Sequence, residues 1–193
     1  LEDFQMVVDV HLMGTVNCTK ACWEIMRSQE YGRVVVTSSS SGLYGNFGQT
    51  NYGAAKLGAV GLMNTLVQEG AKYNIKVNAL APTAGTRMTE GLIAEKAFDL
   101  LTPETVTPAV LYLVSEDAPN RTILCAGAGA YSVSKIVETE GMWLSPEEQT
   151  PEGIAAHWDG ISAPEGERVL NAGFEQSIKM AAKAAEGLGI KLD

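Results

Sequence analysis

A tyrosine and a lysine four residues apart, Tyr52 and Lys56, could form a proton-transfer pair in this sequence. Residues at this spacing share one face of a helix, so their side chains can lie together. A nearby ammonium favours the phenolate form of a tyrosine, which suits the phenol to general acid or base chemistry near neutral pH. A tyrosine and a lysine often occur at this spacing by chance, so the functional interpretation of the pair depends on the surrounding residues.

A β-branched run and a hydroxyl cluster precede the pair. Residues 34–36 are all valine, and Thr37 and four serines follow, among them Ser39. A glycine-containing loop then leads to the helix that carries Tyr52 and Lys56. In a parallel sheet, this order delivers side chains to the carboxyl ends of the strands, where ligands bind. We therefore expect Ser39, Tyr52 and Lys56 to share a site, with the other serines, Ser38, Ser40 and Ser41, as local hydrogen-bonding groups.

These residues resemble the catalytic serine and the YxxxK pair of the short-chain dehydrogenase/reductase family. Residues 7–15, 42–52 and 76–82 are similar to family landmarks and occur in the family's order. Within the family, the sequence most resembles the (3R)-hydroxyacyl-CoA dehydrogenase part of type 2 peroxisomal multifunctional enzymes. The segments that carry this second resemblance are residues 44–49, 82–89 and 127–129.

The resemblance implies an NAD(P)-dependent oxidoreductase that transfers a hydride to or from a secondary alcohol or ketone, with a (3R)-hydroxyacyl-CoA as the expected substrate. Tyr52 would transfer the proton, Lys56 would assist it and bind the nicotinamide ribose, and Ser39 would hold the substrate oxygen. His11 stands where the family usually has a relay asparagine, and both a relay role and a structural role stay open. NAD is the expected cofactor, NADP is not excluded, and a steroid or another acyl-carrier substrate is an alternative.

Three further residues would contact the cofactor by the same resemblance. Pro82 and Thr83 stand where the family usually has Pro-Gly, and the exchange of glycine for Thr83 is expected to change the backbone angles of the loop. Thr86 resembles the hydroxyl that binds the nicotinamide carboxamide. The alternative for Thr86 is a helix cap.

Helix and strand patterns alternate along the chain, which predicts an α/β fold with a parallel sheet. We expect the C-terminal portion of a Rossmann-like doubly wound parallel sheet with a helical C-terminal extension, and Asn74 in a left-handed conformation at a helix end. The expected helices cover residues 2–28, 51–72, 90–96 and 103–115, and the expected strands cover 34–38, 76–81 and 121–126.

The expected domains are residues 1–129, the catalytic half of the family's domain, and residues 130–193, a mainly helical extension that packs on it or on a partner subunit. Apolar side chains in the extension could cover an acyl chain or a neighbouring subunit's site, or could serve subunit packing. They are Trp143, Leu144, Trp158, Leu170, Phe174 and Ile178.

The sequence contains no strand, glycine-rich turn and helix in the order that receives a cofactor pyrophosphate. Residues 127–129 are glycine-spaced but come late in the chain and are a weak match. We therefore expect the N-terminal nucleotide-binding half to lie outside this chain, in about a hundred residues that precede Leu1 or in another chain. These 193 residues alone should bind NAD weakly. A non-catalytic subunit or scaffold is the alternative function.

Composition limits the partners. The net charge of −9 argues against binding to a nucleic-acid backbone, and no apolar run approaches the roughly 20 residues of a membrane span. Cys18 and Cys22 are expected to be buried thiols in a reducing compartment rather than metal ligands. We expect a homodimer or homotetramer in the cytoplasm, or in the peroxisome if the chain is part of a eukaryotic multifunctional enzyme.

Overall fold

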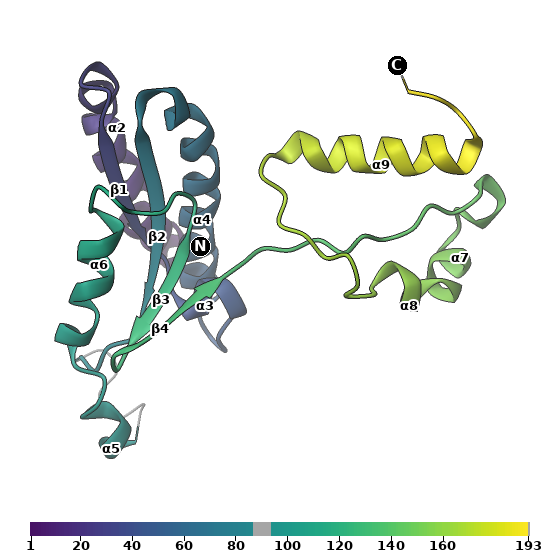
Figure 1. Ribbon diagram of the computed structural model, residues 1–193. Coiled ribbons are helices and arrows are strands. Elements are labelled where there is room, and N and C mark those ends of the chain that lie inside the picture. The colour runs from purple at the N-terminus through teal and green to yellow at the C-terminus, as the bar shows by residue number, and fades with distance from the viewer. Residues whose placement is uncertain (87–93, 193) are drawn as a thin grey trace. The chain divides into compact units, whose positions relative to one another are not determined.

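The computed structural model of the chain describes residues 1–86 and 94–192 (Figure 1). The described chain forms two compact units, Leu1–Ser134 and Lys135–Asp193. The division into functional domains at residue 129 stays a prediction.

The first unit contains a four-stranded sheet with the strand order β1-β2-β3-β4. Strands β1 (Gly32–Thr37), β2 (Ile75–Pro82) and β3 (Ile123–Gly127) are parallel, as predicted. Strand β4 (Ala130–Ser134) pairs antiparallel with β3, which the sequence pattern did not predict.

The turn between β3 and β4 explains the antiparallel pair. Ala128 and Gly129 have φ values of 51° and 74°, and positive φ at both central residues is the requirement of a type I′ hairpin turn. A parallel connection would need a dozen or more residues, so two residues can only return the chain antiparallel. The glycine-spaced segment 127–129 therefore closes a hairpin.

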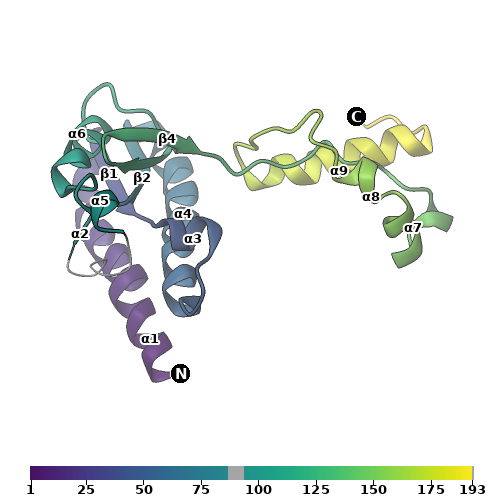
Figure 2. The same ribbon diagram turned by 90° about the horizontal axis from the view of Figure 1, so that it is seen from below.

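Helices cover both faces of the sheet (Figures 1 and 2), with α4 on one side and α6 on the other. One apolar core joins strand residues such as Val36 and Val77 to Met63 of α4 and to Trp23 of α2. The other core joins Leu80 to α6. A strand that is buried on both faces has a continuous run of apolar residues in its sequence. The valines at residues 34–36 form such a run, which is typical of a parallel sheet. The helices of this unit are α1 (Glu2–Val8), α2 (Gly14–Ser28), α3 (Ser40–Tyr44), α4 (Thr50–Gly70), α5 (Glu95–Phe98) and α6 (Thr107–Leu113).

The predicted long helix over residues 2–28 is confirmed, with one feature that was not expected. A π-helical turn, Asp9–Met13, joins α1 to α2, and Figure 2 shows the two helices running on into each other. The predicted helix 51–72 is confirmed by α4 and the 3₁₀ turn Ala71–Tyr73, and Asn74 follows with a φ of 54°, in the left-handed conformation. The helix predicted over 90–96 falls largely outside the described residues.

The prediction that Cys18 and Cys22 are buried is wrong. Both thiols are exposed on α2, where they line a groove of about 690 Å³ beside the outer edge of β1. Within residues 1–86 and 94–192, no further strand pairs with that edge, so the apolar surface of α2 lies uncovered there.

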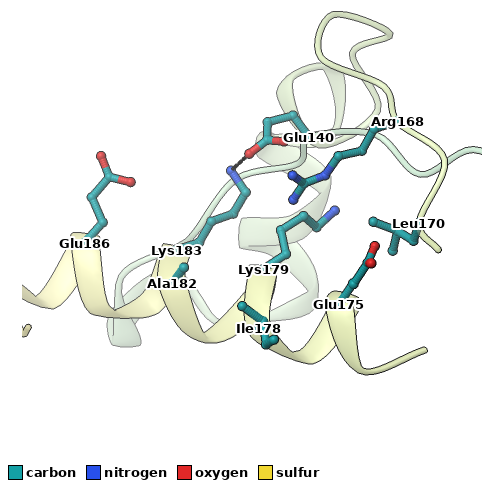
Figure 3. A pocket seen from close by; sticks show the side chains of 9 residues that line it. All are labelled: Glu140, Arg168, Leu170, Glu175, Ile178, Lys179, Ala182, Lys183 and Glu186. Atoms are coloured by element: carbon teal, nitrogen blue, oxygen red, sulfur yellow. Dashed lines mark ion pairs between the residues drawn. The ribbon is translucent and has the colours of Figure 1, made fainter. Parts of the chain in front are cut away.

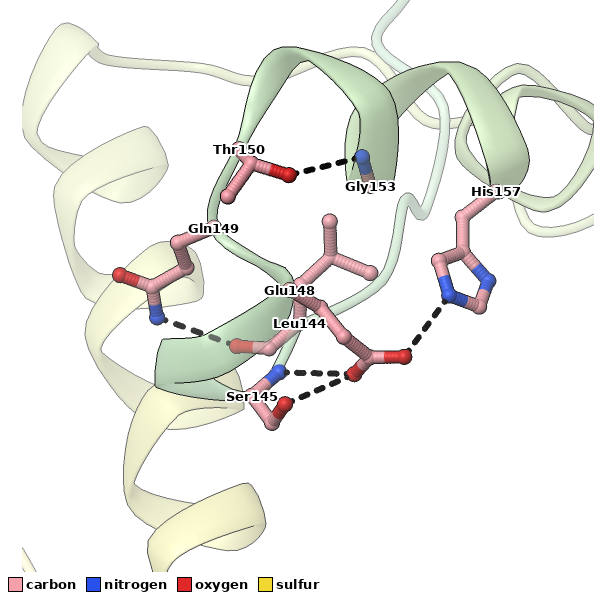
Figure 4. Close-up of polar contacts among 7 residues, drawn as sticks. All are labelled: Leu144, Ser145, Glu148, Gln149, Thr150, Gly153 and His157. Carbon is pink, nitrogen blue, oxygen red and sulfur yellow. Dashed lines mark hydrogen bonds and ion pairs between the residues drawn. The ribbon is translucent and has the colours of Figure 1, made fainter.

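In the second unit, three short helical segments precede a long helix: the 3₁₀ turn Pro146–Glu148, α7 (Pro151–Ala156), α8 (Trp158–Ile161) and α9 (Gly173–Leu188). Ser145 and Glu148 form a capping box at the first of them (Figure 4). The same Glu148 carboxylate lies 3.1 Å from Nε2 of His157, and the Thr150 hydroxyl accepts a hydrogen bond from Gly153 N at 3.0 Å. This capping chemistry fixes the start of the 3₁₀ turn.

A buried lysine and an aromatic contact are among the contacts that hold helix α9 to the rest of its unit. Lys179 Nζ donates to Thr139 O at 2.8 Å and pairs with the Glu138 carboxylate. Trp143 lies so close to Gly187 that a Cβ there would come within 2.1 Å of the indole, so only glycine fits.

A pocket of about 420 Å³ opens beside α9 (Figure 3). Lys179 and Lys183 extend from the helix toward Arg168 and Glu140, and the Lys183–Glu140 ion pair measures 2.6 Å. Acidic and basic side chains line the pocket in equal number, so it shows no preference for ligands of one charge, and it contains none of the predicted catalytic residues. No helix in the described ranges is long and apolar enough to cross a bilayer.

Candidate active site

Tyr52 lies in the first turn of α4, close to the carboxyl end of β1. The Asn51 side chain accepts a hydrogen bond from Tyr52 N at 2.7 Å, which satisfies one of the unpaired N–H groups of the first turn. The small residue Gly53 lets α4 approach α3, because a Cβ at Gly53 would come within 3.0 Å of Ser41 O. The Tyr52 side chain is half-buried, so its ring keeps some contact with solvent.

Lys56 lies one helical turn further on and reaches back to the end of β1. Its side chain is buried, and Nζ donates to Thr37 O at 3.0 Å. The same Nζ lies 5.6 Å from the centre of the Tyr52 ring, within the range of a cation–π contact. Burial lowers the pKa of the Lys56 ammonium from its ordinary value, because removal from water disfavours the charged form.

The structure separates the serines that follow β1. The Ser38 hydroxyl is buried and donates to Lys56 O at 2.9 Å, so it holds α4 against the strand. Ser39 is the N-cap of α3, and its Oγ accepts from Ser41 N at 3.2 Å. As an acceptor in that bond, the Ser39 hydroxyl keeps its proton available for another oxygen.

His11 lies at the centre of the π-helical turn and faces Tyr52. The two rings meet edge to face, with centroids 5.1 Å apart and planes at 88°. Burial lowers the pKa of His11 below its ordinary 6.5, and the nearby positive charge of Lys56 lowers it further. The lowered pKa favours the neutral imidazole at neutral pH, and this form can both donate and accept a hydrogen bond. Single π-turns inside helices often occur at functional sites.

The predicted cofactor residues follow β2, the strand next to β1. Because the two strands are parallel, Thr37 and Pro82 lie at the same edge of the sheet. Thr83 N donates to Ala126 O at 2.8 Å, and Thr83 is not among the described residues with positive φ. Thr86 is exposed and ends the described part of this loop, and residues 87–89 of the predicted motif lie outside it.

Two features of the site were not found from the sequence. Thr37 contributes its backbone carbonyl to Lys56, and a backbone acceptor has no sequence signal. Gln49, just before α4, has a buried Oε1 with no hydrogen-bond partner among the described residues. Buried polar atoms without partners are rare and are often satisfied by a ligand or water. In the same part of the chain, no three His, Cys, Asp or Glu side chains gather closely enough to hold a metal ion.

Known proteins are similar to this chain in sequence and in fold. The profile of the short chain dehydrogenase family matches residues 1–97. The chain belongs to this family. A short-chain type dehydrogenase/reductase of Mycobacterium tuberculosis is 46% identical over 175 residues, which cover 90% of this chain and 60% of that protein. The type 2 peroxisomal multifunctional enzyme of Mus musculus is 45% identical over 163 residues, 83% of this chain and 22% of the enzyme.

A solved structure gives the same result for the fold. The full-length type 2 peroxisomal multifunctional enzyme of Drosophila melanogaster superimposes with a TM-score of 0.85 and 34% identity, over 97% of this chain and 35% of that one. The predicted family and the predicted Rossmann-like α/β fold are confirmed. The chain thus spans between about a fifth and three fifths of the length of these relatives.

Proposed function

We propose that this chain carries the proton-transfer site of an NAD(P)-dependent oxidoreductase acting on a (3R)-hydroxyacyl thioester. The observation that carries the proposal is the grouping around Tyr52, which has the Lys56 ammonium over its ring and the His11 ring in edge-to-face contact with it. This grouping lies at the carboxyl edge of a parallel sheet, where substrates bind in open α/β folds. The resemblance of residues 44–49 to the multifunctional enzymes supports the acyl substrate.

Each side chain has a role that its surroundings allow. Tyr52 donates a proton to the substrate oxygen in reduction or accepts it in oxidation, and Lys56 stabilises the phenolate that results. Ser39 donates its hydroxyl proton to the same oxygen as negative charge develops there. His11 either relays the proton to solvent or only supports the Tyr52 ring, and both roles remain part of the proposal.

The site also fits a nicotinamide cofactor. A lysine ammonium has three donors, and within the described residues Lys56 uses one of them, on Thr37 O. A ribose hydroxyl could accept another, while Pro82, Thr83 and Thr86 would lie along the nicotinamide. A bound nicotinamide supplies the hydride chemistry, and the protein orients it. We propose NAD, with NADP as the alternative.

Replacement of Tyr52 by phenylalanine in the complete protein tests this function. We expect Tyr52→Phe to lower the turnover of a 3-hydroxyacyl or 3-oxoacyl thioester with NAD(H) by roughly 10²- to 10⁴-fold, because the group that transfers the proton is lost. Tyr112→Phe, on the exposed side of α6, is the matched control. Unchanged turnover in Tyr52→Phe would remove Tyr52 from the mechanism. If the unmodified protein turns over no thioester, the alternative of a non-catalytic subunit is favoured.

A further inference from the structure

Helix α3 packs against α4 at a separation that only glycine allows. Gly42 of α3 is buried, and an ideal Cβ built on it would lie 2.8 Å from Lys56 Cβ and 2.9 Å from both Lys56 C and Leu57 N. Heavy atoms in van der Waals contact stay about 3.5 to 4.0 Å apart, and two of these three atoms belong to the α4 backbone, which cannot turn aside. We propose that Gly42 is a positioning residue that sets the distance of Ser39 from Tyr52, an inference that rests on the function proposed above.

Gly42 and Ser39 belong to one hydrogen-bonded turn. The Ser39 carbonyl accepts from Gly42 N at 2.9 Å and from Leu43 N at 3.0 Å. The Ser39 hydroxyl accepts from Ser41 N at 3.2 Å. Helix α3 has five residues, so a shift of Gly42 moves the whole turn and its N-cap with it. Gly42 is not among the described residues with positive φ, so the contact with α4, and not the backbone angle, requires glycine here.

Helix α4 is the fixed side of this contact. The Lys56 ammonium donates to Thr37 O at 3.0 Å, and Ser38 Oγ donates to Lys56 O at 2.9 Å. Two consecutive residues at the end of β1 therefore hold α4 at Lys56. Further along α4, Met63 is 1% exposed in the apolar core between this helix and the sheet, and a closely packed core yields little to strain. A methyl group added at Gly42 would therefore displace α3 and leave α4 in place.

This displacement would change one distance in the site and preserve another. Tyr52 and Lys56 both belong to α4, so the 5.6 Å between the Lys56 ammonium and the centre of the Tyr52 ring would stay as it is. Ser39 would move with α3, and its hydroxyl would leave the position from which it donates to the substrate oxygen. A misplacement of about 1 Å can lower a rate by roughly a hundredfold. The expected defect therefore lies in the chemical step and acts through Ser39.

Two glycines of α4 provide matched comparisons. A Cβ at Gly53 would lie 3.0 Å from Ser41 O, a contact that a small shift relieves, whereas a Cβ at Gly61 would meet no described atom within 4 Å. Each exchange of glycine for alanine at these positions and at Gly42 adds one methyl group to a helix, and alanine is the better helix former in every case. The three exchanges therefore differ in the contact with neighbouring segments rather than in helix propensity.

The test is a double-mutant cycle on the complete protein, measured as kcat and KM for a 3-hydroxyacyl thioester with NAD. We expect Gly42→Ala to lower kcat by about ten- to a hundredfold and to change KM by less than about threefold. Gly53→Ala should lower kcat less, and Gly61→Ala should leave it unchanged. In a Ser39→Ala background, Gly42→Ala should change kcat by less than about twofold, because the group through which it acts is already absent.

An equally large loss in both backgrounds would overturn the proposal, since a partly inactive protein loses the same fraction of its activity whether or not the Ser39 hydroxyl is present. Unchanged kcat in a folded Gly42→Ala protein would overturn it as well. Where Gly42→Ala does not fold, the cycle uses Gly53→Ala, and absence of coupling to Ser39 then rejects the inference. Absence of thioester turnover in the unmodified protein would reject the proposed function together with the inference, whereas normal turnover without this coupling would reject the inference alone.

Discussion

The imidazole of His11 links the chemistry of the site to its dependence on pH. The imidazole and the Tyr52 ring meet edge to face, and the pKa of His11 is lowered first by burial and then by the charge of Lys56. At pH values just below 6.5, His11 is therefore protonated to a greater extent in the unfolded chain than in the folded chain. Stability should rise with pH through this window, because the unfolded state holds more protons there than the folded state.

We expect the unmodified protein to lose stability as the pH falls from about 7.5 to about 5, and His11→Gln to lose less, because glutamine does not titrate. Each unit by which the pKa is lowered corresponds to about 1.4 kcal/mol once the pH lies below both values. Urea unfolding of both proteins at the two pH values measures the difference. An equal loss in both proteins would show that other groups, such as Glu138 and Glu148, dominate the acid response.

At the scale of elements, Asn74 and Ala128 are two of the residues that adopt the left-handed conformation in connections. Asn74 ends the helical segment that follows α4, with a φ of 54°, and Ala128 opens the β3–β4 turn, with a φ of 51°. Asparagine tolerates this conformation, whereas alanine incurs a steric penalty in it. The left-handed backbone angle is therefore tolerated by Asn74 at one end of the sheet, whereas it is strained at Ala128 at the other end.

These two positions predict opposite effects of substitution. Asn74→Ala should lower the free energy of unfolding by about 1 kcal/mol, and Ala128→Gly should raise it by about the same amount. Chemical denaturation measures both values, with Asn74→Gly as the control that should be nearly neutral. A stabilising Asn74→Ala, or a destabilising Ala128→Gly, would show that side-chain contacts outweigh the backbone preference.

At the scale of the whole molecule, the second unit has its own polar anchor. Lys179 is buried, and its ammonium bonds to Thr139 O and pairs with Glu138, while Gln176 bonds to the same carboxylate. A lysine is rarely buried unless it is paired, so this network holds α9 to residues 138–139. Lys183 makes a comparable pair with Glu140 nearer the surface, with side chains that are 20% and 46% exposed.

Lys179→Met should therefore lower the hydrogen-exchange protection of residues 135–192 by roughly ten- to a hundredfold, because the Thr139 carbonyl loses the hydrogen bond from Lys179 and the Glu138 carboxylate loses its ion pair. Lys183→Met is the matched control and should change protection by less than about fivefold, as expected for a solvent-screened pair. Equal effects of the two substitutions would contradict the assignment of Lys179 as the anchor.

The sequence by itself determined those features that depend on residues close together in the chain. The four-residue spacing of Tyr52 and Lys56 predicts their shared helix face, and β-branched runs predict the parallel strands. Asn74 marks a helix end, because the left-handed conformation that it tolerates is a local property of the residue. The family resemblance rests on the same local motifs, so the sequence alone was enough to indicate it.

Only the tertiary structure decided the features that depend on distant contacts. The bond from Lys56 to Thr37 O, the π-turn that brings His11 against Tyr52, and the unpaired acceptor of Gln49 among the described residues have no local signature. The exposure of Cys18 was mispredicted for the same reason. An apolar helix face in the sequence does not reveal whether another segment of the chain covers it. Burial, and with it the pKa of Lys56 and His11, is a property of packing between segments far apart in the chain.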